Sequence, residues 1–434
     1  MRVLMFGWEF PPHIAGGLGT ACYGMTKGLA ANGVDVLFVM PSASGDEDES
    51  AVKIINASDV ACDVVDHNVE SFLGKVQFVQ VGSNMVPYMD PDDFYRIVEA
   101  EKSMTRDEFS IRYGQKFKFS GKYGSNLMEE VARYALVGAT IAKQYEGQFD
   151  IIHAHDWLTY LAGMAAKQVS GKPLVIHVHA TSYDRASDDH IDTRVLDIET
   201  RGMQAADKVM AVSELTRNIC INKYGINPDK VFAVHNAVDF SGRKNLVVER
   251  GVKDKVVTFL GRVTYQKGPE YFIEAAAKIL KRCENVRFVM AGSGDMLNRC
   301  IRHVARLGIS DRFHFTGFLR GADVQKMFAL SDVYMMPSIS EPFGISPLEA
   351  MQTYVPSIIS KQSGCAEILR YAIKTDFWDV DAMADAIYAL LNYPAMARMA
   401  AEKGYDEVNA IKWNEVAAKI KGIYQDAINE SAKK

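Results

Sequence analysis

The sequence predicts an α/β protein made of two doubly wound domains that face each other across an interdomain cleft. Short runs rich in β-branched residues alternate with longer amphipathic stretches, a pattern typical of βαβ units and a parallel sheet. A polar, charged and weakly periodic connector at residues 241–254 interrupts this alternation, which then restarts. The length of 434 residues also favours two domains.

The N-terminal domain is expected to span residues 1–240. Amphipathic stretches such as 20–32 and 127–143 predict helices between its strands. The predicted strands lie near Arg2–Phe6, Val34–Pro41, Val76–Val81, Ile151–His155, Leu174–His179, Val209–Ser213 and Val231–Val234.

The C-terminal domain is expected to span residues 241–412. Its predicted strands are the runs VVTFLGR, VRFVMAGSG, RFHFTGF, DVYMMPS and VPSIIS, and a helix is expected from Gly268 to Arg282. The stretch Trp413–Asn429 predicts a long helix. We expect the C-terminal segment 413–434 to pack back on the N-terminal domain.

The composition is that of a soluble globular protein, with 48% hydrophobic and 24% charged residues. A net charge of −5 argues against a nucleic-acid partner, because phosphate binding normally requires a basic surplus. No apolar run reaches the roughly 18 residues of a transmembrane helix, and the N-terminus does not resemble a signal peptide. The six scattered cysteines fit reduced thiols, so we expect a cytoplasmic protein.

Open parallel sheets bind ligands at the carboxyl ends of their strands, so the chemistry is expected there. The first candidate is the run Ala15–Gly19, which follows the first strand and precedes a helix. Gly16 and Gly17 let the backbone approach a ligand, and the helix start offers amides to an anion. A tight βα turn without a ligand is the alternative.

The second candidate is a set of four histidines at two neighbouring strand ends. His153 and His155 lie two residues apart, as do His177 and His179, so each pair is expected to share one face of its strand. We favour hydrogen bonding to a polar substrate. A metal centre and a purely structural role remain the alternatives.

The third candidate is the run Gly261–Gly268 after the first strand of the C-terminal domain. Arg262 supplies a planar fork for phosphate oxygens, and Lys267 supplies a point charge five residues later. Together with the helix start they are suited to clamping a diphosphate. The run lacks the arrangement of a P-loop, which disfavours a Mg-ATPase.

The fourth candidate is a pair of carboxylates, Glu341 and Glu349, separated by Gly344 and Ser346. The amides near Gly344 can reach a phosphate, and a carboxylate can accept hydrogen bonds from ribose hydroxyls. Paired glutamates also occur in glycosidases, but a glycosidase has no need of the Arg262 and Lys267 clamp.

Together these motifs resemble the retaining glycosyltransferases of the GT-B fold, which has two Rossmann-like domains. The resemblance is to glycosyltransferase family 4 and its glycogen and starch synthase relatives, and it covers nearly the whole chain. Two motifs of the second domain carry the superfamily resemblance. They are Gly261-Arg262 with Lys267-Gly268, and Glu341 with Glu349. The segment His-Ala-His-Asp-Trp at 153–157 and the early Gly-Gly-Leu point to the glycogen synthase side.

The resemblance implies four catalytic residues. His155 would contact the transferred sugar, and Glu341 would contact a sugar hydroxyl. Arg262 and Lys267 would neutralise charge on the leaving nucleoside diphosphate. No cofactor and no metal ion are expected, because these charges and helix dipoles take over the electrostatic work. Attack from the front face implies retention without a protein nucleophile.

The resemblance also implies a set of donor-binding residues. They approach the diphosphate, supply amides to the distal phosphate, or contact the ribose. They are Gly16, Gly17, Gly344, Ile345, Ser346 and Glu349.

Three departures from the bacterial glycogen synthase pattern leave the donor open between ADP-glucose and UDP-glucose. Ile14 stands where a lysine is usual, and Phe343 stands where a cysteine is frequent. Ser125-Asn126 stands where an Asp-Asn pair often precedes the histidine segment.

The acceptor is expected to be a soluble glucan, because residues 1–110 are acid-rich rather than basic. The segment 111–123 interleaves aromatic and basic residues and could form an acceptor platform or a plain amphipathic strand. Tyr113, Phe117 and Asn126 are the candidate acceptor residues. A family 4 transferase for surface polysaccharide, lipid or small-molecule acceptors is the alternative, with peripheral membrane contact left open. A UDP-sugar epimerase or hydrolase and a metal hydrolase are further alternatives.

Overall fold

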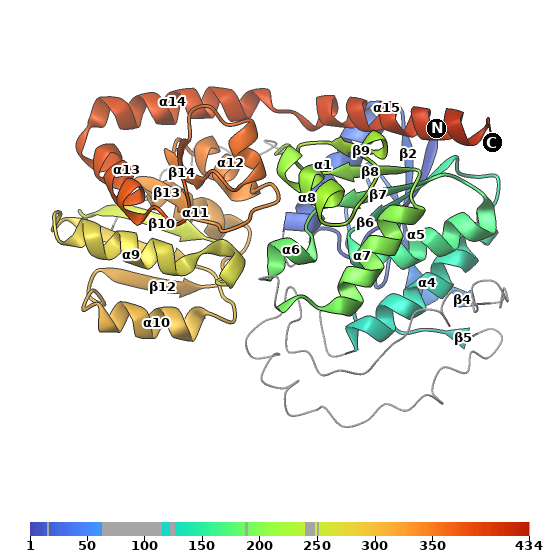
Figure 1. The fold of residues 1–434 in the computed structure, drawn as a ribbon, viewed down its shortest axis with the longest axis horizontal. Helices are drawn as coiled ribbons and strands as arrows, with labels where there is room; N and C mark the ends of the chain where they lie inside the picture. The colour runs from blue at the N-terminus through green and yellow to red at the C-terminus, as the bar shows by residue number, and fades with distance from the viewer. Residues whose placement is uncertain are drawn as a thin grey trace. The chain divides into compact units, whose positions relative to one another are not determined.

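The computed structural model describes residues 1–14, 17–62, 115–121, 126–186, 190–238, 248–249 and 251–433. The predicted strand near 76–81 and most of the connector 241–254 lie outside these ranges. The chain divides into two compact units (Figure 1). The first unit comprises Met1–Tyr183, Ser187–Asn236 and Trp413–Lys434, and the second comprises Asp184–Ala186 and Ala237–Lys412.

The first unit is built on a seven-stranded sheet with the order β3-β2-β1-β6-β7-β8-β9, in which every neighbouring pair is parallel. The strands are β1 (Arg2–Phe6), β2 (Asp35–Met40), β3 (Lys53–Asn56), β6 (Ile151–His155), β7 (Leu174–Val178), β8 (Lys208–Ala211) and β9 (Val231–Ala233). The sequence predictions of six of these strands are confirmed. The edge strand β3 was missed because four residues with the pattern KIIN are too short for a periodicity signal.

The helices of the first unit cover both faces of this sheet. They are α1 (Gly17–Ala31), α4 (Leu127–Gln144), α5 (Trp157–Ser170), α7 (Thr193–Ala205), α8 (Glu214–Asn222) and α15 (Trp413–Ser431). The short helix α6 (Ser182–Arg185) follows β7, and β4 (Ala61–Cys62) pairs with β5 (Gln115–Lys116) as a small antiparallel ladder.

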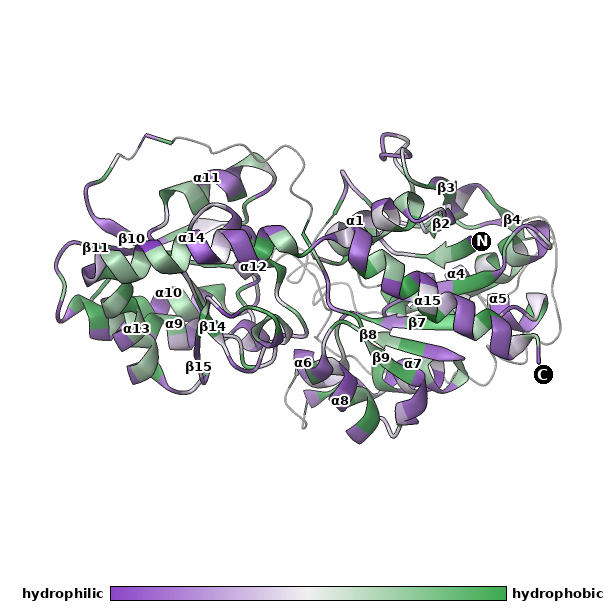
Figure 2. Cartoon of the chain, turned by 90° about the horizontal axis from the view of Figure 1, so that it is seen from above, coloured by the Kyte–Doolittle hydropathy of each residue, from purple (hydrophilic) through white to green (hydrophobic). Residues whose placement is uncertain are grey.

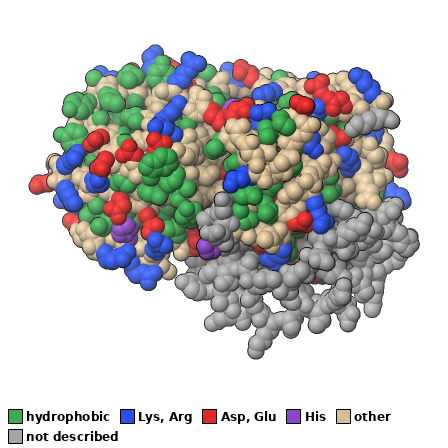
Figure 3. Space-filling model, viewed as in Figure 1, with side chains coloured by type: hydrophobic (Ala, Val, Ile, Leu, Met, Phe, Trp, Pro, Cys, Tyr) green, Lys and Arg blue, Asp and Glu red, His purple; other side chains and the backbone are tan. Residues whose placement is uncertain are grey.

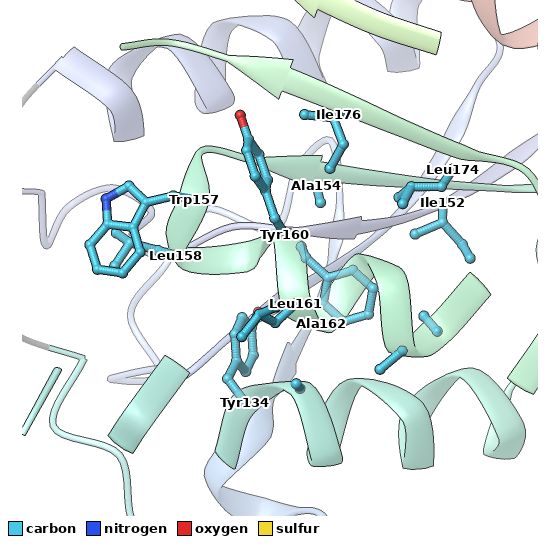
Figure 4. Close-up of a cluster of buried hydrophobic side chains, with 14 of the residues drawn as sticks. Tyr134, Ile152, Ala154, Trp157, Leu158, Tyr160, Leu161, Ala162, Leu174 and Ile176 are labelled. Carbon is cyan, nitrogen blue, oxygen red and sulfur yellow. The ribbon is translucent and has the colours of Figure 1, made fainter. Parts of the chain in front are cut away.

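Alternation along β6 divides its side chains between two different environments. Ile152 and Ala154 join the large hydrophobic cluster under α4 and α5, which Figure 4 shows around Tyr134 and Tyr160. The intervening His153 points the other way, toward α15, where it contacts Tyr424. A strand that is buried on both faces is typical of a doubly wound sheet.

The long helix α15 packs against α1. A Cβ on Gly24 would lie 2.1 Å from the indole nitrogen of Trp413, and one on Gly28 would lie 2.5 Å from the Trp413 carbonyl oxygen. The two glycines therefore allow the backbones to approach closely. Asn32 also donates to the side chain of Asn414 at 2.7 Å. Helix α15 carries both hydrophilic and hydrophobic residues in Figure 2, as expected for a helix that buries one side.

The second unit has a six-stranded parallel sheet with the order β12-β11-β10-β13-β14-β15. The strands are β10 (Lys255–Leu260), β11 (Val286–Ala291), β12 (Phe313–Gly317), β13 (Val333–Met336), β14 (Ser357–Ser360) and β15 (Ile373–Thr375). The helices are α9 (Pro269–Leu280), α10 (Leu297–Arg306), α11 (Ala322–Leu330), α12 (Ile345–Gln352), α13 (Val380–Asn392) and α14 (Pro394–Ala410). This confirms the five strands predicted from the sequence and adds β15.

Strand order reverses at one point in each sheet, between β1 and β6 in the first unit and between β10 and β13 in the second. Helices on either side of a reversal lie on opposite faces, which leaves a crevice at the carboxyl ends of the central strands. All four sequence motifs follow or end strands at or next to these points. The two sheets therefore place the candidate residues where doubly wound folds bind ligands.

The surface carries both signs of charge. On the face shown in Figure 3, basic and acidic side chains are interspersed over the described part of the chain. None of the described helices combines the length and apolar character needed to cross a membrane.

Candidate active site

The loop after β10 is shaped by Gly268. Its φ is +63°, and a Cβ at this position would lie 2.2 Å from the carbonyl oxygen of Pro337 at the end of β13. Only glycine fits both the left-handed backbone and this close approach. The loop thereby holds Arg262 and Lys267 at the switch point of the second unit, where the Arg262 Nη2 donates to the Gln266 Oε1 at 3.3 Å.

Lys267 and Glu341 form an ion pair across this switch point. They are 74 residues apart in the chain, and their side chains are 19% and 8% exposed. The hydroxyl of Ser338 donates to the same carboxylate oxygen at 3.2 Å. An ammonium group has three donors, so Lys267 can hold the carboxylate and still bind a phosphate oxygen. The carboxylate can likewise accept a hydrogen bond from a sugar hydroxyl.

Backbone contacts with a later segment fix Glu341 in place. Its amide donates to the Gln362 carbonyl at 2.9 Å, and the Gly364 amide donates to the Glu341 carbonyl at 2.9 Å. The segment 362–364 was not predicted from the sequence, because its glutamine, serine and glycine carry no charged or metal-ligating group. Its only signal was its place directly after the strand β14.

The start of α12 presents the predicted phosphate-binding amides. Gly344 has a φ of +93° and is the N-cap residue, and no side chain caps the helix that begins at Ile345. The uncapped first turn leaves amides for an anion, which the helix dipole also favours. Ser346 lies in this first turn, and Glu349 lies about one turn further and is half-buried.

In the first unit, the four predicted histidines form a compact row. Ring centroids of His153 and His155 lie 4.1 Å apart, and those of His177 and His179 lie 4.3 Å apart. His155 and His177 are register partners on β6 and β7. The prediction that each pair shares a face is confirmed. We call these four residues the histidine row.

The histidine row is held uncharged. Burial lowers the pKa of all four imidazoles below the usual value, and that of His179 falls to about 3. The His155 Nδ1 and the His179 Nε2 are 3.0 Å apart and share one hydrogen bond. The His153 Nδ1 lies 2.5 Å from the Tyr424 hydroxyl. Among the described residues, the Nε2 of His155 and both nitrogens of His177 have no hydrogen-bond partner.

Asp156 orients the end of the row. It directly follows His155 and has a φ of +56°, a conformation that is strained for a residue other than glycine. Its Oδ1 accepts hydrogen bonds from the amides of His179 at 2.7 Å and Ala180 at 3.2 Å. The side chain thus ties the loop after β7 to the end of β6.

The glycine-rich loop is described only in part. Gly16 lies outside the described residues, and Gly17 is the exposed first residue of α1. The Glu9 Oε1 accepts a hydrogen bond from the Gly19 amide at 3.0 Å, which braces the preceding loop against the helix start. A Cβ on Gly19 would lie 2.4 Å from the Ile14 Cγ2, so the loop packs tightly on this turn.

The structure describes two of the three candidate acceptor residues. Tyr113 lies outside the described residues. Phe117 is only 6% exposed and packs in the hydrophobic core, where it contacts Phe119. Its acceptor role stays a prediction. Asn126 is exposed and donates to the Glu130 Oε1 at 3.1 Å.

Two further residues reach the histidine row from distant segments. Cys22 lies on the buried side of α1, and Tyr424 lies on the buried side of α15. The helical spacing of apolar residues places both on sheet-facing sides, but it does not reveal which strand residues they meet.

Two family models match this chain. The model described as the starch synthase catalytic domain matches residues 2–233, and the model described as glycosyl transferases group 1 matches residues 245–407.

The chain is also similar to individual proteins. It is 27% identical over 388 residues to a glycosyltransferase of Methanocaldococcus jannaschii, covering 86% of this chain and 84% of the relative. It is 22% identical over 440 residues to glycogen synthase of Mycobacterium tuberculosis, covering 98% of this chain and 94% of the relative.

Solved structures share the fold over nearly the whole chain. Sucrose-phosphate synthase of Thermosynechococcus elongatus aligns with a TM-score of 0.71 at 17% identity, covering 99% of both chains. The Anabaena protein HepE, solved in complex with UDP-glucose, aligns with a TM-score of 0.64 at 16% identity, covering 98% of this chain and 100% of that one.

Proposed function

The chain belongs to the family of the starch synthase catalytic domain and is a GT-B hexosyltransferase, and we propose that it transfers glucose from ADP-glucose or UDP-glucose to an α-glucan with retention. The observation that carries the proposal is the Lys267–Glu341 ion pair at the switch point of the second unit. A cation for the diphosphate and an acceptor for sugar hydroxyls lie side by side there.

In this proposal, Arg262 and Lys267 bind the oxygens of the nucleoside diphosphate. Charge builds up on these oxygens as the bond to the sugar breaks, so preorganised cations stabilise the transition state more than the ground state. The uncapped start of α12 adds amides for the distal phosphate, and Glu349 accepts hydrogen bonds from the ribose.

Glu341 and His155 are proposed to hold the transferred sugar. A neutral imidazole donates one hydrogen bond and accepts another, which suits a sugar hydroxyl. The low pKa of His155 keeps it in this form at neutral pH. The acceptor hydroxyl attacks the anomeric carbon as the diphosphate leaves, and the departing phosphate takes up the hydroxyl proton.

Two observations support the proposed donor and the proposed acceptor. One of the similar structures was solved with UDP-glucose, and one of the relatives is a glycogen synthase. The described cysteines form no disulfide with one another, which fits the proposed reducing, cytoplasmic compartment.

The test is an assay of nucleoside diphosphate release from ADP-, UDP- and GDP-sugars, with and without glycogen and with and without EDTA. We expect release from ADP- or UDP-glucose that depends on glycogen and persists in EDTA. Release that ignores glycogen but requires a lipid or small-molecule acceptor would replace the glucan proposal with the family 4 alternative. Release with water alone would indicate a hydrolase or epimerase.

A further inference from the structure

Cys22 meets two members of the histidine row inside the first unit. Its sulfur and one ring nitrogen each of His155 and His179 all lie within 4.8 Å of one another. The three residues come from α1, the end of β6 and the residue after β7. A thiol and two imidazoles are the side chains that zinc prefers.

We propose that Cys22, His155 and His179 form a binding site for a thiophilic divalent cation such as Zn²⁺. Nothing in the proposed transfer reaction requires this ion.

The spacing suits a tetrahedral ion after a small adjustment. Bond lengths of about 2.0 to 2.3 Å place neighbouring ligand atoms roughly 3 to 4 Å apart. The His155 Nδ1 and the His179 Nε2 are 3.0 Å apart, in the hydrogen bond that they share without the ion. Insertion of the ion replaces this hydrogen bond by two metal–nitrogen bonds, and the shared proton moves to the other nitrogen of the ring that donated it.

The protonation state of the two imidazoles suits a metal ligand. Imidazoles bind metals in the neutral form, and burial keeps both rings neutral. The thiol of Cys22 gives up its proton to solvent when its sulfur bonds to the metal. Burial raises the pKa of that thiol most, and the nearby carboxylates of Glu9 and Asp156 raise it further. The same two carboxylates would attract a cation.

A second set of ligands competes less well. His153, His155 and His177 also have nitrogens within 4.8 Å of one another. This set has no thiolate to offset the charge of the ion in a dry interior. His153 also uses its Nδ1 with Tyr424, and all three side chains are fully buried. In the favoured set, His179 is partly exposed to solvent.

Occupation of this site would oppose transfer, a consequence that rests on the proposed function. His155 cannot bind the ion and reorient freely toward a sugar at the same time. The ion is therefore expected to inhibit the enzyme, and a chelator is expected to restore it.

The first experiment measures binding to the chelator-treated full chain. Zn²⁺ is titrated in competition with a chromogenic chelator, and Co²⁺ is titrated while its absorption is recorded. We expect one ion per chain, with a thiolate-to-cobalt charge-transfer band and the intense visible bands of tetrahedral cobalt.

The variants Cys22→Ala and His179→Ala locate the site. Each is expected to weaken binding by more than about 100-fold, since losing even an outer-shell partner costs roughly 10- to 100-fold. Cys220→Ala is the matched control, because Cys220 is also fully buried in the first unit but lies in the hydrophobic core. Unchanged binding in Cys22→Ala and His179→Ala, or no stoichiometric binding by the wild type, would overturn the proposal.

A second readout covers the case in which a variant folds poorly. An ion that binds only the folded state raises the Tm, so Zn²⁺ should raise the Tm of the wild type and of Cys220→Ala but not of His179→Ala. Equal shifts in all three proteins would count against the site. Inhibition is tested separately as the ratio of transfer rates in Zn²⁺ and in EDTA. If no transfer is found at all, the binding data still decide the metal site, so the two proposals fail independently.

Discussion

The two units place polar residues at equivalent points of similar sheets, but they treat charge in opposite ways. In the first unit, His153, His155 and His177 are wholly buried on strands and are kept neutral by desolvation. In the second unit, Lys267 and Glu341 stand on loops and neutralise each other. A buried group must either lose its charge or find a partner, and the two units use one solution each.

The two units also position their polar side chains in different ways. The register of two strands aligns the histidine row. The second unit relies on tight loop geometry instead, since Gly268 must lie against Pro337 to carry Lys267 to Glu341. We therefore expect substitutions in the second unit to affect charge and loop shape, and those in the first to affect hydrogen bonding and packing.

The largest effect is expected from Lys267→Ala. It removes the cation proposed for the diphosphate and leaves Glu341 buried without its ion pair, so transfer should fall by about 10³-fold or more. The measurement is kcat/KM for nucleotide sugar. Lys278→Ala is the control, because Lys278 forms a more exposed ion pair with Asp381. Near-normal transfer by Lys267→Ala would remove Lys267 from the site.

Gly268→Ala should destabilise the loop itself. The left-handed conformation costs an alanine about 1 to 2 kcal/mol, and the contact with the Pro337 oxygen adds a clash, so we expect a loss of more than about 3 kcal/mol. Urea unfolding measures the change. Gly308→Ala is the matched control, because Gly308 has a φ of +70° with nothing within 4 Å. Equal losses in the two variants would mean that the contact with Pro337 is unimportant.

His155→Ala is expected to reduce transfer by about 10²-fold, as for the loss of one positioned hydrogen-bonding group. Because the imidazole is neutral, His155→Gln should recover part of this loss, whereas a charged acid or base could not be replaced by an amide. The readout is kcat at saturating donor, with EDTA present. No difference between the alanine and glutamine variants would contradict the hydrogen-bonding role.

Gly28→Ala and Gly422→Ala should change stability in opposite directions. A methyl group on Gly28 meets the backbone of Trp413 and should cost about 2 kcal/mol, since α1 and α15 must separate. Gly422 in α15 has nothing within 4 Å, so alanine there should stabilise the protein by about 0.5 to 1 kcal/mol. Chemical denaturation of both variants tests the predicted packing of α15 on α1.

A modest loss of stability is expected from Tyr424→Phe. It removes the hydroxyl that bonds His153 and should cost about 1 to 2 kcal/mol, because the buried His153 nitrogen loses its partner. Tyr393→Phe serves as the control, since Tyr393 is 59% exposed. A similar, negligible change in both variants would show that the bond to His153 contributes nothing to stability.

Local patterns in the sequence predicted most of the described strands, the helices α1, α4, α9 and α15, and the location of the motifs. A short run rich in β-branched residues predicted β6, and the period of two along a strand predicted the shared face of His153 and His155. Candidate ligand residues could be named because parallel strands bring their carboxyl ends to one edge of a sheet. The exceptions were short or edge elements such as β3 and β15, where too few residues carry the pattern.

The sequence by itself determined the fold class and the two groups of polar residues. Only the tertiary structure decided which residues meet: Lys267 with Glu341, Cys22 with His155, and Tyr424 with His153. It also placed Phe117 in the hydrophobic core of the first unit. The physical reason is range. Periodicity reports on neighbours a few residues apart, whereas these contacts depend on strand order and helix docking across as many as 271 residues.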